Sequence, residues 1–195
     1  EERLLELSSE VQRLEVIESD ELRPEVLKST ALSRALAPGS KHGRVVLRLE
    51  GQGLVADFPQ GRVSLIRKGE KIEAEFSSDS ESVVSQVWRD QAGTWQDSSH
   101  SRQWASPEDR KAHRAPHFEE KLKHDGQGRE VRDQTTRQGN LLTNSEVITQ
   151  DGQEISTLTQ VTNNGQFESL LERTLERKDG RVVVKEKSQQ GALVI

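Results

Sequence analysis

Cysteine, tyrosine and methionine are absent from this chain of 195 residues, and aromatic residues are few: four phenylalanines and three tryptophans. Without cysteine the protein forms no disulfide, no thiolate metal site and no cysteine nucleophile. Apolar residues make up 31% of the chain, or about 38% with glycine, against roughly 45–50% in a typical globular chain. We therefore expect a thin hydrophobic core. An enzyme usually needs a deeper interior to shape a pocket.

An excess of basic residues and a long apolar run are also lacking. The chain has 28 basic and 33 acidic residues, a net charge of −5, and the two signs are interspersed. A nucleic-acid-binding surface needs unopposed basic residues, so no nucleic-acid partner is expected. No apolar run approaches the ~20 residues that a membrane-spanning helix needs, so no transmembrane segment is predicted.

The chemical motifs of enzymes and cofactor sites are missing or incomplete. His113 and His117 are four residues apart, which would suit a metal on a helix, but Pro116 between them disfavours a helix and no third ligand is indicated. Gly51 and Gly53 lack the lysine and serine of a phosphate-binding loop, and no serine stands in a Gly-x-Ser-x-Gly motif. The sequence therefore predicts no catalytic residue, no cofactor and no metal site.

Residues 1–39 predict a helical segment of two short helices. The first covers residues 1–18 and has one apolar stripe at a 3-4-3 spacing. The stripe consists of Leu4, Leu7, Val11 and Leu14. It packs on its own domain or on a partner helix, and two heptads are too few to predict a coiled coil. A second helix is expected from Pro24 to about Leu36, before Ala37-Pro38-Gly39.

Residues 40–98 contain short β-like runs separated by turn residues, and we expect a first set of hairpins there. The runs are Arg44–Glu50, Leu54–Phe58, Arg62–Arg67, Lys71–Ser77 and Val83–Arg89. A further hairpin around Asp90–Gly93 would place Trp88 and Trp95 directly opposite each other. Residues 99–116 are polar and contain two prolines, so we predict a long loop with a short helix after Ser106.

A glycine repeat gives the strongest signal, in residues 117–195. Gly126, Gly139, Gly152 and Gly165 recur every 13 residues, mostly after Asp or Asn, and Asp179-Gly180 follows. Asp-Gly and Asn-Gly favour two-residue hairpin turns, because both central positions need a positive φ. Strands of eleven residues, ~36 Å long, would then alternate with tight turns. The pattern predicts a long-stranded β-meander of about six strands.

Residues 166–178 fit either a strand or a helix. Leucine, glutamate and arginine favour helix there. A turn at Asp179-Gly180, however, would pair Arg173 with Glu186, Glu172 with Lys187 and Leu175 with Val184, which are favourable cross-strand pairs. We favour the strand.

Ideal two-residue turns distribute apolar side chains over both faces of the meander. One face would hold Leu141, Val147, Leu158, Phe167, Leu171, Leu175, Val182 and Val184, and the other Val131, Leu142, Ile148, Ile155, Val161, Leu170 and Val183. Neither face is wholly apolar, which favours an open, elongated or curved sheet over a small packed barrel. A β-bulge would exchange the faces beyond it.

The fold class that these patterns predict is mainly β: an antiparallel β-meander with an N-terminal helical segment, in which residues 40–98 and 117–195 form one continuous domain. We expect a non-enzymatic protein-interaction or assembly module that binds other protein subunits or self-associates. The alternative is a carrier that shelters a lipid or other apolar ligand in a curved sheet or incomplete barrel.

The candidate partner contacts are the Leu4–Leu14 stripe, the three tryptophans and the C-terminal strand. Trp88, Trp95 and Trp104 would form an exposed platform for a partner or, as we favour, the hydrophobic plug of the first sheet. Arg181–Gln189 is expected to be an exposed edge, with Val183 and Lys185 as contacts. Val183→Pro is expected to remove a backbone donor from that edge and weaken the partner without unfolding the sheet.

Overall fold

The computed structural model describes residues 48–50, 53–58, 61–178 and 181–191. The two helices expected within residues 1–39 lie outside these ranges, and so does the stripe of Leu4, Leu7, Val11 and Leu14. The chain divides into two compact units, Glu1–Ser101 and Arg102–Ile195. A single continuous domain of residues 40–98 and 117–195 stays a prediction.

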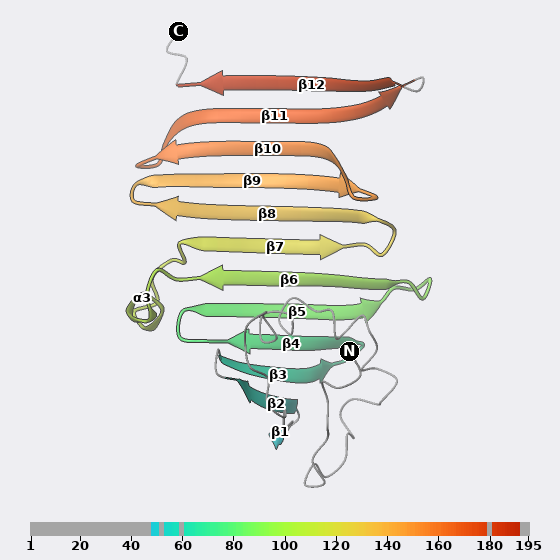
Figure 1. Cartoon of the computed structure of the whole chain (residues 1–195), viewed down its shortest axis with the longest axis vertical. Coiled ribbons are helices and arrows are strands. Elements are labelled where there is room, and N and C mark those ends of the chain that lie inside the picture. The colour runs from blue at the N-terminus through green and yellow to red at the C-terminus, as the bar shows by residue number, and fades with distance from the viewer. Residues whose placement is uncertain (1–47, 51–52, 59–60, 179–180, 192–195) are drawn as a thin grey trace. The chain divides into compact units, whose positions relative to one another are not determined.

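The first unit contains a sheet whose strands follow one another in sequence (Figure 1). The strands are β1 (Arg48–Glu50), β2 (Gly53–Phe58), β3 (Gly61–Lys68), β4 (Lys71–Ser77), β5 (Glu81–Arg89) and most of β6 (Trp95–Gln103). β1 to β5 pair antiparallel. The predicted β-like runs coincide with these strands; of the first run, only residues 48–50 lie in the described part, and they form β1.

One face of the first sheet is the core. Val63 lies opposite Phe76, and Phe76 lies opposite Val83, so alternate residues of β3, β4 and β5 share that face. The buried side chains on it include Leu54, Val63, Leu65, Ile72, Ala74, Phe76, Val83 and Val87. The other face carries mainly polar residues, as expected of an antiparallel sheet with one buried side.

Strand β6 corrects the prediction of a loop over residues 99–116, because the strand continues to Gln103. Ser99 and Ser101, two residues apart, are only 7% and 1% exposed. Small polar residues at alternate positions thus occupy the buried side of this strand, and a hydrophobic pattern does not reveal it. The short helix α3 (Pro107–Lys111) begins after Ser106, whose hydroxyl accepts a hydrogen bond from Asp109 N at 3.1 Å.

The expectation that Trp88 and Trp95 are directly opposite is wrong by one residue. Asp90 N donates to Thr94 O at 3.0 Å, which pairs these two residues and places Arg89 opposite Trp95. The Arg89 guanidinium lies 4.7 Å from the centre of the Trp95 ring. Trp88 is consequently on the other face, where Lys71 Nζ lies 4.5 Å from its ring centre.

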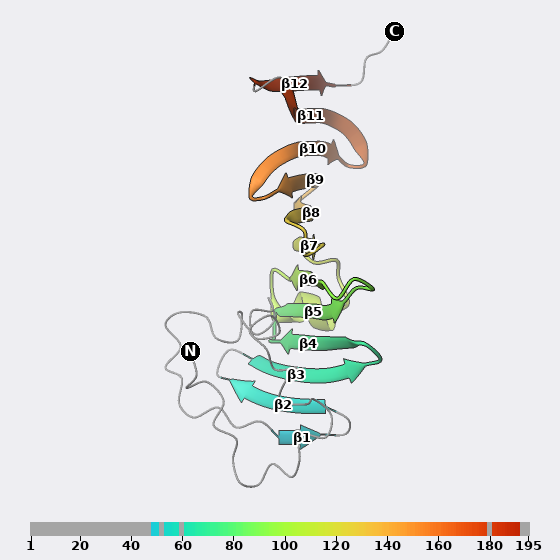
Figure 2. The same ribbon diagram turned by 90° about the vertical axis from the view of Figure 1, so that its right-hand side faces the viewer.

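The second unit is a meander of six strands, as the glycine repeat predicted. It consists of β7 (Phe118–His124), β8 (Arg129–Gln138), β9 (Leu141–Gln150), β10 (Gln153–Asn163), β11 (Gln166–Lys178) and β12 (Arg181–Gln190). Figure 2 shows these strands following one another in a single layer. Residues 166–178 form a strand, and the three predicted pairs of β11 with β12 are all present.

The tight turns of the meander follow the glycine repeat with two departures. Asp151 and Gly152 have φ values of 52° and 76°, and Asn164 and Gly165 have 50° and 78°, as a type I′ turn requires. The turn after β8 is instead centred on Gly139 and Asn140, one residue later than predicted, and residues 125–128 form a longer loop. Gly180 lies outside the described residues.

Two bulges change the predicted faces. The register shifts at Ile155 between β9 and β10 and at Glu168 between β10 and β11. Leu158 and Phe167 therefore lie on the face that was predicted for Val183, and Val161 lies on the face that was predicted for Val184. Each unpaired residue reverses the alternation beyond it.

Candidate interaction surface

Both faces of the second unit are accessible, since none of its described residues is buried. We name the faces after β12: Val184 lies on one and Val183 on the other. Through the strand registers, the Val184 face also carries Leu175, Leu171, Val147 and Arg132. The open sheet that the mixed patterning predicted is thus present in this unit.

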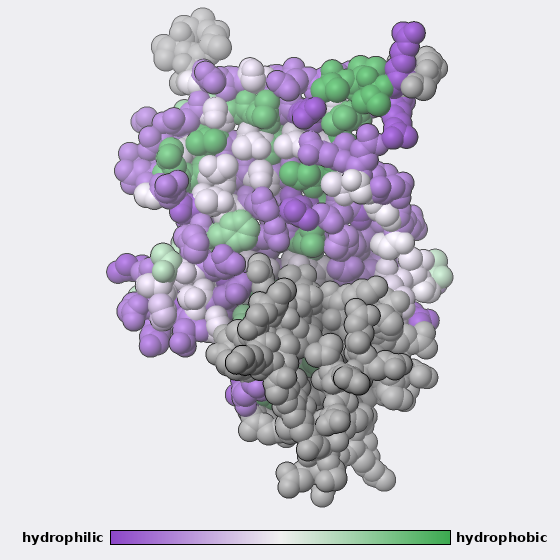
Figure 3. Space-filling model, viewed as in Figure 1, coloured by the Kyte–Doolittle hydropathy of each residue, from purple (hydrophilic) through white to green (hydrophobic). Residues whose placement is uncertain are grey.

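The β11–β12 hairpin exposes apolar side chains. Val182 and Val184 are 53% and 48% exposed, and Leu171, on the same face, is 38% exposed. On the opposite face Val183 is 38% exposed. Figure 3 shows an apolar patch near the turn that joins β11 and β12. Sequence reasoning named Val183 as a partner contact but not Val182 and Val184, although three consecutive valines in one strand point to both faces.

The hydrogen bonds of β12 alternate between its inner and its outer side. Gly191 N donates to Glu168 O at 2.6 Å, which fixes this pair as a hydrogen-bonded one. In an antiparallel ladder such pairs alternate with pairs that make no mutual hydrogen bond. The odd-numbered residues of β12 therefore direct their N–H and C=O groups to β11, and Val182, Val184, Glu186, Ser188 and Gln190 direct theirs outward.

This alternation corrects the proposed test at Val183. Val183 lies opposite Glu176 in a hydrogen-bonded pair, so its N–H belongs to the internal ladder rather than to the edge. The outward donors next to it are those of Val182 and Val184. β12 is the last strand in the order of the described sheet, and among the described strands only β11 pairs with it. The outer side of β12 is thus a row of backbone groups suited to strand pairing.

Basic residues dominate β12 on the Val183 face. Arg181, Lys185 and Lys187 share that side, whereas the acidic Glu186 is on the other. Lys185 Nζ lies 2.7 Å from Glu176 Oε1, with the side chains 61% and 49% exposed, so this ion pair is worth less than about 1 kcal/mol. Three basic residues and one acidic residue give β12 a formal charge of +2, in a chain of net charge −5.

The tryptophans form neither one platform nor one plug. Trp95 packs against Ile72 and Val87 in the core of the first unit, whereas Trp88 is on the other face of that sheet. Trp104 belongs to the second unit, where its Nε1 donates to Arg114 O at 2.8 Å and Arg110 stacks 5.2 Å from its ring centre. Trp104 thus stabilises the loop around α3. Only Trp95 belongs to the hydrophobic plug of the first sheet that we favoured for all three tryptophans.

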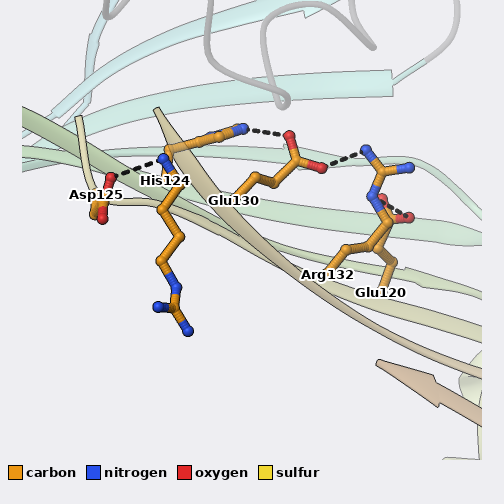
Figure 4. A network of polar contacts seen from close by, with 6 residues as sticks. Glu120, His124, Asp125, Glu130 and Arg132 are labelled. Carbon is orange, nitrogen blue, oxygen red and sulfur yellow. Dashed lines mark hydrogen bonds and ion pairs between the residues drawn. The ribbon is translucent and has the colours of Figure 1, made fainter. Parts of the chain in front are cut away.

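A polar network joins β7 and β8 on the Val184 face (Figure 4). Glu130 accepts from Arg132 at 2.8 Å and lies 2.8 Å from His124 Nε2. Arg132 Nε lies 4.0 Å from Glu120, which also accepts from Gln134 at 2.6 Å. One guanidinium thus sits between two carboxylates across the strands. These contacts join neighbours on β7 and β8, or, for Glu130 and Arg132, residues two apart along β8, and we interpret the network as structural.

Structural contacts shift the pKa values of three ionisable groups in the first unit. Burial raises the pKa of Glu73, but hydrogen bonds from Lys68 at 2.6 Å and Gln86 at 2.8 Å outweigh it and hold that pKa below its usual value. The bond to Glu73 raises the pKa of Lys68. The Thr94 backbone amide, followed by the Gln96 amide, lowers the pKa of Asp90 in its turn.

His113 and His117 are both exposed, and the described residues contain no group of three or more His, Asp or Glu side chains that could hold a metal ion. No described helix is long and apolar enough to cross a membrane.

Comparison with protein-family models, with curated proteins and with solved structures gave no significant match.

Proposed function

We propose that this chain is a non-enzymatic protein-interaction or assembly module whose second unit binds another protein through the outer edge of β12. The observation that carries the proposal is the outward row of backbone groups from Val182 to Gln190. A strand of another protein can complete its hydrogen bonds at such an edge, with side-chain pairs adding specificity.

The exposure and the charge of β12 support an edge that pairs with a specific partner rather than with any strand. Long, exposed edges invite indiscriminate pairing, and lysines on the edge strand restrain it. β12 combines exposed valines, whose burial would stabilise a complex, with Lys185 and Lys187, whose positive charge restricts which strands can pair there. The carrier gains no comparable support, because the apolar side chains of the second unit are divided between two faces and none in its described part is buried.

Site-specific photo-cross-linking in the cells that produce the chain tests the proposal. A photoreactive residue replaces Ser188, on the outer edge, or Ser145, in the central strand β9 of the same unit. We expect one or a few discrete cross-linked proteins from position 188 and none of them from position 145. Equal products from both positions, or none from position 188, would contradict the proposed edge contact.

A further inference from the structure

The side chains of β12 indicate what kind of strand its edge accepts. In antiparallel pairing, a docked residue lies directly opposite a β12 residue and shares its face. Residues opposite Lys185 and Lys187 thus meet positive charge on the Val183 face. Residues opposite Val182 and Val184 meet exposed apolar surface on the Val184 face.

A second copy of β12 fits this edge poorly. Pairing through the outer side requires even-numbered residues to lie opposite even-numbered ones, so basic residues of the Val183 face meet each other. The registers with the largest overlap place Lys185 opposite Lys185, Lys185 opposite Lys187, Arg181 opposite Lys187, or Lys187 opposite Lys187. Like charges directly opposite each other destabilise a sheet, so charge argues against self-pairing.

The β11–β12 hairpin shows which side chains the strand does accept. On its inner side, Lys187 lies opposite Glu172, Val184 lies opposite Leu175, and Lys185 bonds diagonally to Glu176. The same side chains of β12 border the outer side. A partner with acidic residues on one face and apolar residues on the other would reproduce these pairs there.

We infer that the outer edge of β12 binds, by antiparallel strand addition, an extended segment of another protein that alternates acidic and apolar residues. The acidic side chains lie opposite Lys185 and Lys187, and β-branched apolar ones lie opposite Val182 and Val184. This inference rests on the proposed function and adds the chemistry of the partner.

A labelled synthetic peptide tests the inference by fluorescence anisotropy with the full chain. The probe, Thr-Thr-Thr-Glu-Lys-Glu-Val-Thr-Val-Glu, places Glu opposite Lys187, Lys185 and Arg181, and Val opposite Val184 and Val182, when it runs antiparallel. A matched control peptide exchanges every Glu for Lys and the Lys for Glu. We expect the acidic peptide to bind at least tenfold more tightly than the control peptide.

Two further arms separate strand addition from simple charge attraction. The first is the acidic peptide with N-methyl groups on both valines, whose N–H groups would donate to β12; it should lose binding. The second is the variant Lys185→Glu with Lys187→Glu, at two exposed positions, which should reverse the preference between the two charged peptides. Circular dichroism checks that this variant is folded. The measurements of the three peptides with the unaltered chain test the inference even if the variant does not fold.

The outcomes distinguish this inference from the proposed function. Undiminished binding of the N-methylated peptide, or equal binding of the two charged peptides, would overturn the inference. If no peptide binds while position 188 still cross-links to a protein, the partner chemistry is wrong and the edge contact stands. If position 188 gives no cross-link, the proposed edge contact and the inferred partner chemistry are both wrong.

Discussion

Proline substitutions at two neighbouring positions test the backbone arrangement of β12. In the ladder fixed by the bond from Gly191 to Glu168, the Val183 amide donates to β11 and the Val184 amide points outward. Val183→Pro therefore removes an internal hydrogen bond, and Val184→Pro removes a donor from the outer edge. Both residues are exposed valines of one strand, so each variant is the control for the other.

The two substitutions should differ clearly in free energy. Val183→Pro loses one ladder bond, with a net value of about 0.5–1.5 kcal/mol, and leaves the Glu176 carbonyl without its donor. Together these cost on the order of 2 kcal/mol, or roughly a 30-fold change in the opening equilibrium of the hairpin. Proline is tolerated on an edge strand where its nitrogen faces outward, so Val184→Pro should cost about 0.5 kcal/mol or less.

Native-state hydrogen exchange of the β11 amides is the assay. Val183→Pro should accelerate exchange in β11, whereas Val184→Pro should leave it almost unchanged. If Val184→Pro opens the hairpin as much as Val183→Pro or more, the assigned alternation is wrong, and with it the outward row of backbone groups.

Three further outcomes are expected from the turns and the ionisable groups. Gly165→Val should destabilise the second unit by about 1 kcal/mol or more in urea unfolding, because a β-branched residue fits a φ of 78° poorly; the exposed strand position Gln166→Val is the control, and an equal effect would refute the turn argument. Asp90→Ala should lower the urea midpoint of the first unit, since the carboxylate accepts from Ala92 N, Thr94 N and Gln96; Asp90→Asn keeps an acceptor and should lower that midpoint less. The folded state holds the pKa of Glu73 below the usual 4.5, so the ionised carboxylate stabilises the first unit above that pH, and this stabilisation is lost as the pH falls through the lower folded value. In Glu73→Gln, the free energy of unfolding of the first unit should therefore decrease less between neutral and acid pH. An unchanged pH dependence would contradict this role.

The meander could be predicted from sequence because its turns need particular backbone angles. Glycine after Asp or Asn marks positive φ, so Asp151-Gly152 and Asn164-Gly165 were located correctly. The cross-strand pairs of β11 and β12 followed from charge and hydrophobicity once the turn was placed. This information is local, and each turn fixes the register of the hairpin that it closes.

Other features depend on interactions that a single sequence does not reveal. The bulges at Ile155 and Glu168 have no local signature, yet each exchanges the faces beyond it. The predicted loop begins at residue 104 rather than 99, with its short helix after Ser106 as expected; its start was missed because β6 buries Ser99 and Ser101, which resemble loop residues. The candidate edge was located from sequence, but its outward donors depend on the hydrogen-bonding alternation, so Val184 was missed in favour of Val183.

Amide exchange along β12, measured by NMR with and without the acidic peptide, tests the account most directly. In the free chain, the amides of Val183, Lys185, Lys187 and Gln189 should be protected, and those of Val182, Val184, Glu186, Ser188 and Gln190 should exchange rapidly. Added peptide should protect the second set and leave the first unchanged. If the second set is already protected in the free chain, or if saturating peptide leaves it rapidly exchanging, β12 is not an open edge that binds a strand.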